Sequence, residues 1–390
     1  MIDSINAKVR EGIAIRNIID YVEQELRGFS EKEFCAVDSL VLSQLSYLMF
    51  DGIVPGTMSL KPAVRIKDTY RTEHLPEMLN HVGSAGENKR LLIALSGSPR
   101  FRDVGMNYYV NELDVEIEKQ FAAVSYILNR KTAYIAFRGT DATFVGWKED
   151  FNMAFLNRVP AQARAVQYVD LVARRLPRNL IIGGHSKGGN LAVYSAVMCR
   201  SAVQRRIKAV YNHDGPGFRE NMLSSDRYAK ISECIHKTVP QSAIIGMLLE
   251  NQEDYTVVRS NRLGIMQHDP FSWEIDGDGF SRLDKVSGSA KFLDRALHNW
   301  LSELSDAERE RFVDALYQII KATNAATIYD FKELGLKDIS RIITLAGNLD
   351  ADTRRFLFDA VKSLIVLSVK NIRQPSQKQN SGEIHEQLSL

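Results

Sequence analysis

The sequence predicts an α/β fold in which a mostly parallel β-sheet is covered by helices. Short runs that are apolar on both faces recur from about residue 90, as expected of strands buried between two helical layers. These runs are 91–95, 121–128, 133–137, 180–184, 208–212 and 255–258. Helical patterns at 161–176 and 190–200 separate some of the runs, which indicates βαβ units. After about residue 285 the strand patterns stop and only helical patterns follow.

This order of patterns divides the chain into four parts. Residues 1–33 contain an N-terminal amphipathic helix, 34–285 the α/β domain, 286–372 a helical C-terminal subdomain and 373–390 a polar, disordered tail. Apolar residues of the first part recur at helical spacing; they are Ile15, Ile18, Ile19, Val22 and Leu26. Docking of this helix on the rest of the fold is the favoured interpretation. Attachment to a membrane surface is the alternative, although the polar face is mixed in charge rather than basic.

The composition is that of a globular protein with no general electrostatic attraction for a polyanion. Of the 390 residues 45% are apolar and 25% are charged, and the net charge is +2. Neither nucleic acid nor an anionic bilayer is therefore an expected partner. The N-terminus lacks the apolar run of a secretory signal, no stretch approaches the about 18 apolar residues of a membrane span, and the three cysteines have no metal-ligand spacing. We expect a cytoplasmic protein without a metal or other cofactor; peripheral contact with lipid stays open, and no oligomeric state is indicated.

A glycine-rich segment, GGHSKGG at residues 183–189, lies between a predicted buried strand and a predicted helix. It contains the G-x-S-x-G pattern, in which a serine sits on a sharp turn and exposes its hydroxyl. The glycines leave room for the turn, and the free N–H groups at the start of the helix favour a developing negative charge. A turn that cradles a phosphate is the alternative, but the segment lacks the Gly-Lys-Ser/Thr ending of a P-loop. Ser186 is therefore the candidate nucleophile of an α/β-hydrolase fold.

The candidate general base is a histidine that follows the serine, because α/β-hydrolases present their catalytic residues in the order serine, acid, histidine. The histidines after Ser186 are His213, His236, His268, His298 and His385. Among these, His268 stands in a loop after the last predicted strand, where the sheet is expected to deliver the base to the serine. A neutral imidazole, with an ordinary pKa near about 6.5, can take the serine proton at cellular pH. An ordinary loop histidine is the alternative.

The acid that orients this histidine is sought among Asp214, Asp226 and Asp254, which lie between the serine and the histidine. Asp214 ends a predicted strand and so lies at the same edge of the sheet as Ser186. Asp226 is in a polar connection, and Asp254 precedes its strand and belongs at the opposite edge. We therefore expect Asp214 to hold the imidazole and to stabilise the imidazolium. A turn-forming aspartate before Gly-Pro-Gly is the alternative.

An oxyanion hole requires two N–H groups that point to the developing charge. The residue after the nucleophile, Lys187, supplies one through its main chain. The strand at 134–137 runs into Gly139 and Thr140, and Thr140 is the candidate for the second donor through its N–H, its hydroxyl or both. A plain turn at the end of the strand is the alternative.

At these positions the chain resembles the class 3 lipases, in which F-R-G-T at a strand end precedes a tryptophan and an aspartate, and G-H-S-x-G-G follows. The corresponding residues here are 137–140, Trp147, Asp150 and 184–189. The combination of FRGTD, GWKEDFNM, GGHSKGGNLA, YNHDGPGF, VPQSAIIGML and QHDPFSW is similar to an uncharacterised bacterial family of lipase-like proteins, over roughly residues 34–285. The resemblance implies an α/β-hydrolase fold and serine-hydrolase chemistry, and no particular substrate.

One departure from the class 3 pattern concerns the acid. Class 3 lipases usually carry it just before a Val-Pro pair after the next strand, whereas this chain reads HKTVP at 236–240, without a carboxylate. Either Asp214, one strand earlier, has taken the role, or the triad is incomplete.

Three functions follow from these observations. The first is hydrolysis of a carboxylic ester, in a small acyl ester or a lipid, through an acyl-enzyme on Ser186. The second is a thioesterase or acyltransferase that uses the same three residues. The third is a catalytically weak binding or scaffold protein that keeps the hydrolase fold, and the missing carboxylate before Val239 motivates it.

Overall fold

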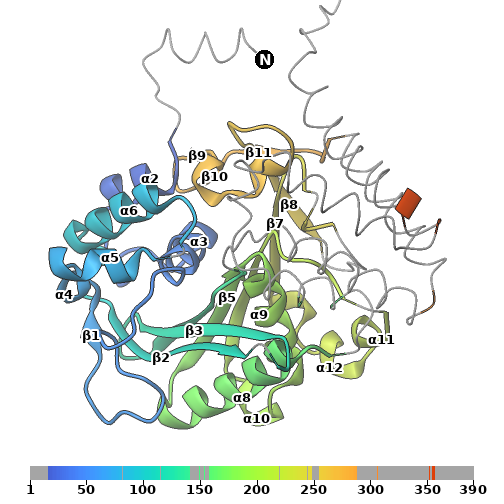
Figure 1. Ribbon diagram of the computed structural model, residues 1–390, viewed down its shortest axis with the longest axis horizontal. Coiled ribbons are helices and arrows are strands. Elements are labelled where there is room, and N and C mark those ends of the chain that lie inside the picture. The colour runs from blue at the N-terminus through green and yellow to red at the C-terminus, as the bar shows by residue number, and fades with distance from the viewer. Residues whose placement is uncertain are drawn as a thin grey trace, which may run out of the picture.

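In the residues that it describes, the computed structural model shows a nine-stranded sheet with helices on both faces (Figure 1). The described residues are 16–80, 82–114, 116–140, 149, 153, 158–218, 220–243, 245–247, 254–287, 305, 351, 354 and 355. Of the helical subdomain predicted at 286–372, the structure describes only residues 286, 287, 305, 351, 354 and 355. The tail predicted at 373–390 lies outside the described residues.

The strands of the sheet follow one another in the order of the chain, from β1 to β8, with β11 at the far edge. The four pairings from β4 to β8 are parallel, and the pairings nearer the two edges are antiparallel. The strands are β1 Val64–Arg65, β2 Gly105–Asp114, β3 Lys119–Ile127, β4 Thr132–Phe137, β5 Asn179–His185, β6 Ile207–His213, β7 Ile235–Pro240, β8 Tyr255–Val258 and β11 Arg282–Leu283. A separate two-stranded hairpin pairs β9 Ile275–Asp276 with β10 Gly279–Phe280. The parallel centre with helices on both faces confirms the predicted α/β-hydrolase class.

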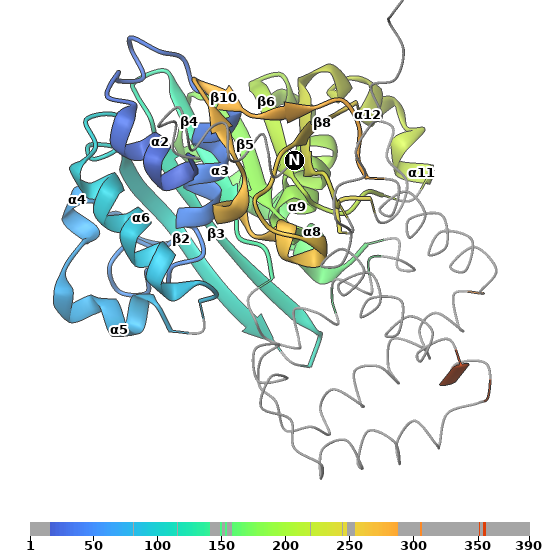
Figure 2. The same ribbon diagram turned by 90° about the horizontal axis from the view of Figure 1, so that it is seen from above.

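The two faces of the sheet are covered by different helices, which Figure 2 shows from above. One face carries α2 Ile18–Gln24, α3 Ala36–Leu45 and α6 Ala85–Gly97, and the other carries α8 Pro160–Arg175 and α9 Lys187–Met198. The shorter helices are α4 Ile66–Thr69, α5 Leu75–Met78, α10 Ser201–Gln204, α11 Glu220–Leu223 and α12 Asp226–Ala229, with 3₁₀ turns η1 Thr72–His74, η2 Ser232–Cys234, η3 Gly264–His268 and η4 Pro270–Ser272.

Alternation along β4 shows how one strand supplies both cores. Tyr134 and Ala136 pack in the core on the α3 side, whereas Ile135 and Phe137 pack in the core on the α8 and α9 side. Strands of this kind are apolar on both faces, and this property made them predictable from the sequence. The structure confirms strands at the runs 121–128, 133–137, 180–184, 208–212 and 255–258.

The prediction of a strand at 91–95 is wrong, because these residues belong to helix α6. Leu91, Leu92 and Leu95 are buried on one side of the helix, while Ile93 is 44% exposed on the other. Five apolar residues in succession fit a buried strand and a helix equally well, and here the helical spacing of the leucines decides.

Helix α2 packs into the core of the sheet rather than standing apart from it. Its N-cap is Asn17, whose side chain accepts from the N–H of Ile19 at 2.8 Å, while Asp20 accepts from the N–H of Asn17 at 2.7 Å. Ile18, Ile19 and Val22 of the predicted apolar stripe are buried against α3 and α6. Leu26 lies beyond the end of the helix and is 58% exposed, contrary to the prediction, and Ile15 lies outside the described residues. The apolar face of α2 is therefore occupied by protein. Over the described part of the chain, no helix has the length and hydrophobicity needed to span a bilayer.

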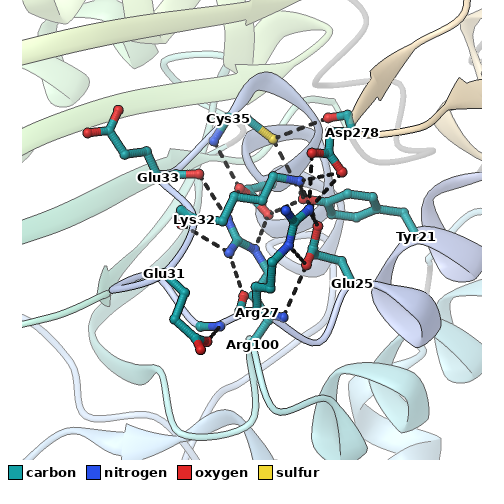
Figure 3. A network of polar contacts seen from close by, with 11 residues as sticks. Tyr21, Glu25, Arg27, Glu31, Lys32, Glu33, Cys35, Arg100 and Asp278 are labelled. Atoms are coloured by element: carbon teal, nitrogen blue, oxygen red, sulfur yellow. Dashed lines mark hydrogen bonds and ion pairs between the residues drawn. The ribbon is translucent and has the colours of Figure 1, made fainter.

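A polar network joins the segment after α2 to the turn between β9 and β10, as Figure 3 shows. Arg27 donates to Glu25 at 2.6 Å and to Asp278, in that turn, at 2.9 Å. Beneath it, Arg100 and Asp38 form an ion pair at 2.6 Å, and both side chains are fully buried. Buried charges are tolerated when they are paired and hydrogen-bonded in this way. The network connects the N-terminal segment to residues more than 240 positions away in sequence.

Candidate active site

Ser186 occupies the turn between β5 and α9, as the glycine-rich segment predicts. Its backbone is left-handed, with φ 58° and ψ −135°, a strained conformation that costs of order 1–3 kcal/mol for a residue other than glycine. A Cβ on Gly184 would overlap the backbone of Gly188, so the strand and the helix can approach this closely only because both are glycine. The N–H of Ser186 donates to the carbonyl of His213 at 2.9 Å, which joins the turn to the end of β6.

Asp214 and His268 are brought together although 54 residues separate them. Asp214 directly follows β6, also with a left-handed backbone (φ 52°), and its N–H donates to the carbonyl of Thr238 at 2.8 Å. Its carboxylate is buried, and its Oδ2 lies 2.6 Å from Nδ1 of His268. The pKa of Asp214 is raised above its ordinary value because the carboxyl group is buried, and the hydrogen bond with His268 offsets part of this rise. Because a carboxylate accepts, Nδ1 carries the imidazole proton and Nε2 is left free to take another.

The segment HKTVP, which has no carboxylate, lies next to the strand that precedes Asp214. Those residues form the end of β7, and the register pairs His213 with Thr238. Asp214 is one residue beyond that pair, level with Val239, and its N–H donates to the carbonyl of Thr238. An acid on β6 reaches the same histidine from the adjacent strand.

The main chain of His268 is held against His185, the residue before Ser186. Its carbonyl lies 2.8 Å from Nε2 of His185, and the two imidazole rings have centroids 4.5 Å apart. The side chain of His268 is 25% exposed, so substrate can reach it. Among the described residues the hydroxyl of Ser186 makes no hydrogen bond to His268. Such bonds are often long in the absence of substrate and tighten in the reacting complex.

The loop that carries His268 is fixed by residues that the sequence did not indicate. The indole N–H of Trp273 donates to the carbonyl of Gln267 at 2.8 Å. The side chain of Gln267 accepts from the N–H of Ser242 at 2.7 Å and donates to the carbonyl of Arg262 at 2.9 Å. Arg262 and Asp269 form an ion pair within the same loop. The motif QHDPFSW contains three of these residues, yet nothing in a single sequence separates anchors from other polar residues.

The two candidate oxyanion donors lie on segments that pass along Ser186. Lys187 is the first residue of α9, so its N–H lies at the N-terminus of the helix, where the helix dipole favours negative charge. Thr140 follows β4, which pairs with β5 through Phe137 and Gly184. A Cβ on Gly139 would stand 3.0 Å from the Cβ of Ser186, which places the residue before Thr140 against the serine.

The side chain of Lys187 is buried and forms an ion pair beneath the turn, a contact that the sequence does not predict. Its Nζ lies 3.0 Å from Oε2 of Glu149 and 3.0 Å from Oε1 of Gln120. Glu149, also buried, accepts from the N–H of Gln120 at 3.1 Å and from the N–H of Ala161 at 2.8 Å. The pair therefore connects the serine turn to the start of β3 and the first turn of α8.

Lys187→Met is expected to lower the free energy of unfolding by about 3–5 kcal/mol, because it leaves the carboxylate of Glu149 buried without a cation. Urea unfolding followed by circular dichroism measures the change. The double variant Lys187→Met/Glu149→Gln is expected to recover part of the loss, since it removes the unpaired charge. Arg65→Met is the control, because it breaks an exposed pair with Asp68 and should change stability little. Equal effects of Lys187→Met and Arg65→Met would contradict this account.

Comparisons with known proteins gave a match to one family model and similarity to solved structures at low sequence identity. The model of the Mbeg1-like family matches residues 95–318, more than half of the chain. Similar solved structures include M37 lipase, at 12% identity and a TM-score of 0.35, covering 55% of this chain and 70% of that one. The native Rhizomucor miehei lipase propeptide complex is similar at 15% identity and a TM-score of 0.33, covering 57% of this chain and 67% of that one. No match was found among curated proteins.

Proposed function

Since the chain belongs to the Mbeg1-like family and carries Ser186, Asp214 and His268 at one edge of its sheet, we propose that it is a serine hydrolase that cleaves carboxylic esters. The observation that carries the proposal is the 2.6 Å contact between Asp214 and Nδ1 of His268, next to the strained turn of Ser186. A buried carboxylate that fixes one tautomer of an exposed imidazole has a clear chemical use. It prepares Nε2 to accept the proton of a nucleophile.

The reaction proceeds in two acyl transfers. Ser186 Oγ attacks the ester carbonyl while His268 Nε2 takes its proton, and the N–H groups of Lys187 and Thr140 receive the negative charge of the tetrahedral intermediate. The intermediate collapses, the alcohol leaves with the proton from His268, and the acyl group stays on Ser186. Water then attacks the acyl-enzyme with His268 again as base, which releases the carboxylic acid and restores the serine. Throughout, Asp214 stabilises the transient imidazolium.

A fluorophosphonate probe is expected to form a covalent adduct on the peptide that contains Ser186. The probe reacts with serines activated by a neighbouring base, so the adduct reports the proposed nucleophile directly. Tryptic digestion and mass spectrometry locate the adduct, and heat-denatured protein is the control. A folded protein that gives no adduct, or an adduct on another residue, would refute the proposal.

Substrate panels then separate the ester hydrolase from a thioesterase or an acyltransferase, which form the same acyl-enzyme. Esters of graded acyl length are compared with the matching thioesters, each with and without an added alcohol. The proposal expects faster turnover of the oxygen esters and release of the free acid. Preferential turnover of thioesters, or transfer of the acyl group to the alcohol, would instead assign the second function.

A further inference from the structure

His185 precedes the candidate nucleophile at a position where the G-x-S-x-G pattern accepts any residue, yet both of its ring nitrogens have partners. Its side chain is buried. Nε2 lies 2.8 Å from the carbonyl oxygen of His268, and Nδ1 lies 3.1 Å from the hydroxyl of Tyr47. Tyr47 comes from the turn that follows α3. Three segments that are distant in sequence therefore meet at this ring.

The partners determine where the protons of this ring lie. A carbonyl oxygen can only accept, so Nε2 of His185 carries the proton and donates to the main chain of His268. Burial, followed by the neighbouring His268, lowers the pKa of His185 well below its ordinary value, so the ring is neutral. A neutral imidazole has one N–H, so Nδ1 is unprotonated and accepts the hydroxyl proton of Tyr47. Donation thus runs from Tyr47 through His185 to the carbonyl of His268.

We propose that Tyr47 and His185 are positioning residues that hold the main chain of the general base beside the nucleophile. The inference rests on the proposed function and adds two residues to it. His185 is adjacent in the chain to Ser186, so its bond to the carbonyl of His268 joins the nucleophile and the base through a single side chain. A neutral ring suits this place, since a second cation 4.5 Å from the ring of His268 would oppose the imidazolium that forms during the reaction.

Tyr47 acts through His185 rather than on the substrate. Its hydroxyl lies close to Gly139, which neighbours Ser186, so a direct role in the oxyanion hole has to be considered. The hydroxyl has one proton, and the nearer of its two acceptors on His185 is Nδ1, at 3.1 Å against 3.4 Å for the carbonyl. With that proton donated to His185, Tyr47 orients the imidazole in the tautomer that the carbonyl of His268 selects.

Steady-state kinetics with an ester substrate tests the role of the two residues. His185→Leu removes the donor to His268 and is expected to lower kcat by about 10²-fold with KM unchanged, because only the placement of the base is lost. His185→Gln is expected to restore most of kcat, since its Nε2 can again donate to the carbonyl. Tyr47→Phe is expected to lower kcat by about tenfold, as loss of a supporting contact does. Tyr168→Phe, which removes a buried hydroxyl bonded to Ser125 on the other face of the sheet, is the control and should keep the parental kcat.

Long-range ¹H–¹⁵N spectra of the imidazoles test the tautomer without reference to activity. We expect His185 to be protonated on Nε2 both in the parent protein and in Tyr47→Phe, because the carbonyl of His268 remains as acceptor. The ¹⁵N shift of Nδ1 is expected to change in Tyr47→Phe, since that nitrogen loses the hydroxyl that donates to it. A proton on Nδ1, or a parental kcat in a folded His185→Leu, would overturn the inference. Should His185→Leu fail to fold, Tyr47→Phe and the spectra decide. Absence of an adduct on Ser186 in the parent refutes the proposed function, whereas a normal adduct with parental rates in the His185 variants refutes only the positioning role.

Discussion

Ser186→Ala is expected to abolish the covalent adduct with a fluorophosphonate and to lower kcat for ester hydrolysis by about 10⁶-fold. The alanine removes the only oxygen that can form the acyl-enzyme in the proposed mechanism, while binding of the ester should persist. Turnover is measured with the best ester of the panel, and circular dichroism establishes that the variant is folded. Serine and alanine both carry a Cβ, so the substitution adds little new strain at the left-handed backbone of residue 186.

Ser195→Ala is the matched control, because Ser195 lies on the same helix, is buried, and donates only to the carbonyl of Ala192 at 3.1 Å. It should be labelled and turn over substrate as the parent does. If Ser186→Ala were labelled as strongly as Ser195→Ala, the nucleophile would have been assigned to the wrong residue.

Asp214→Asn is expected to lower kcat by about 10⁴-fold, as loss of the acid does in other triads. The amide keeps the size of the carboxylate and tolerates the left-handed backbone, but it lacks the charge that stabilises the imidazolium. Its NH₂ group can also turn toward Nδ1 of His268 and favour the tautomer that cannot accept the serine proton. Labelling rates and kcat measure the effect.

Asp226→Asn provides the comparison for this acid, since Asp226 also lies between the serine and the histidine in sequence but is exposed. It should leave the rates unchanged. If the parent protein and Asp214→Asn were labelled at the same slow rate, the result would favour the hypothesis that the chain is a binding or scaffold protein with a hydrolase fold. A large loss confined to Asp214→Asn would reject that reading.

The fold class could be predicted because several short runs that are apolar on both faces alternate with helical patterns, as expected of parallel strands buried between helices. A single run of this kind is not sufficient, since the one at 91–95 belongs to a helix. Among the strands longer than two residues, β2 and β7 escaped this reasoning, as did the two-residue strands β1, β9, β10 and β11. β2, with GMNYYVNELD, mixes polar and apolar residues toward the edge of the sheet, and β7 contains Lys237 at a buried position. Edge position and burial of a charge both depend on tertiary partners, so neither is visible in the local pattern.

The candidate site could be predicted where its residues depend on the ends of strands and on their order along the chain. Ser186 follows from its motif, and Asp214 follows from the rule that parallel strands end at one edge of the sheet. Tyr47 and Glu149 could not be found in this way, because each meets the serine turn only through the fold. His185 and Lys187 stand at variable positions of the motif, where a single sequence gives no reason to expect a fixed partner.

Because each strand from β2 to β8 pairs with the next one along the chain, the sheet can form strand by strand in the order in which the chain is synthesised. No strand of this series has to await a partner from a distant part of the sequence, which keeps the entropy lost on closing loops small. The turn of Ser186 and the strand before Asp214 emerge earlier than the loop that carries His268. Under the proposed function, a nascent chain would therefore hold Ser186 without its general base, and would stay inactive until the sheet is almost complete.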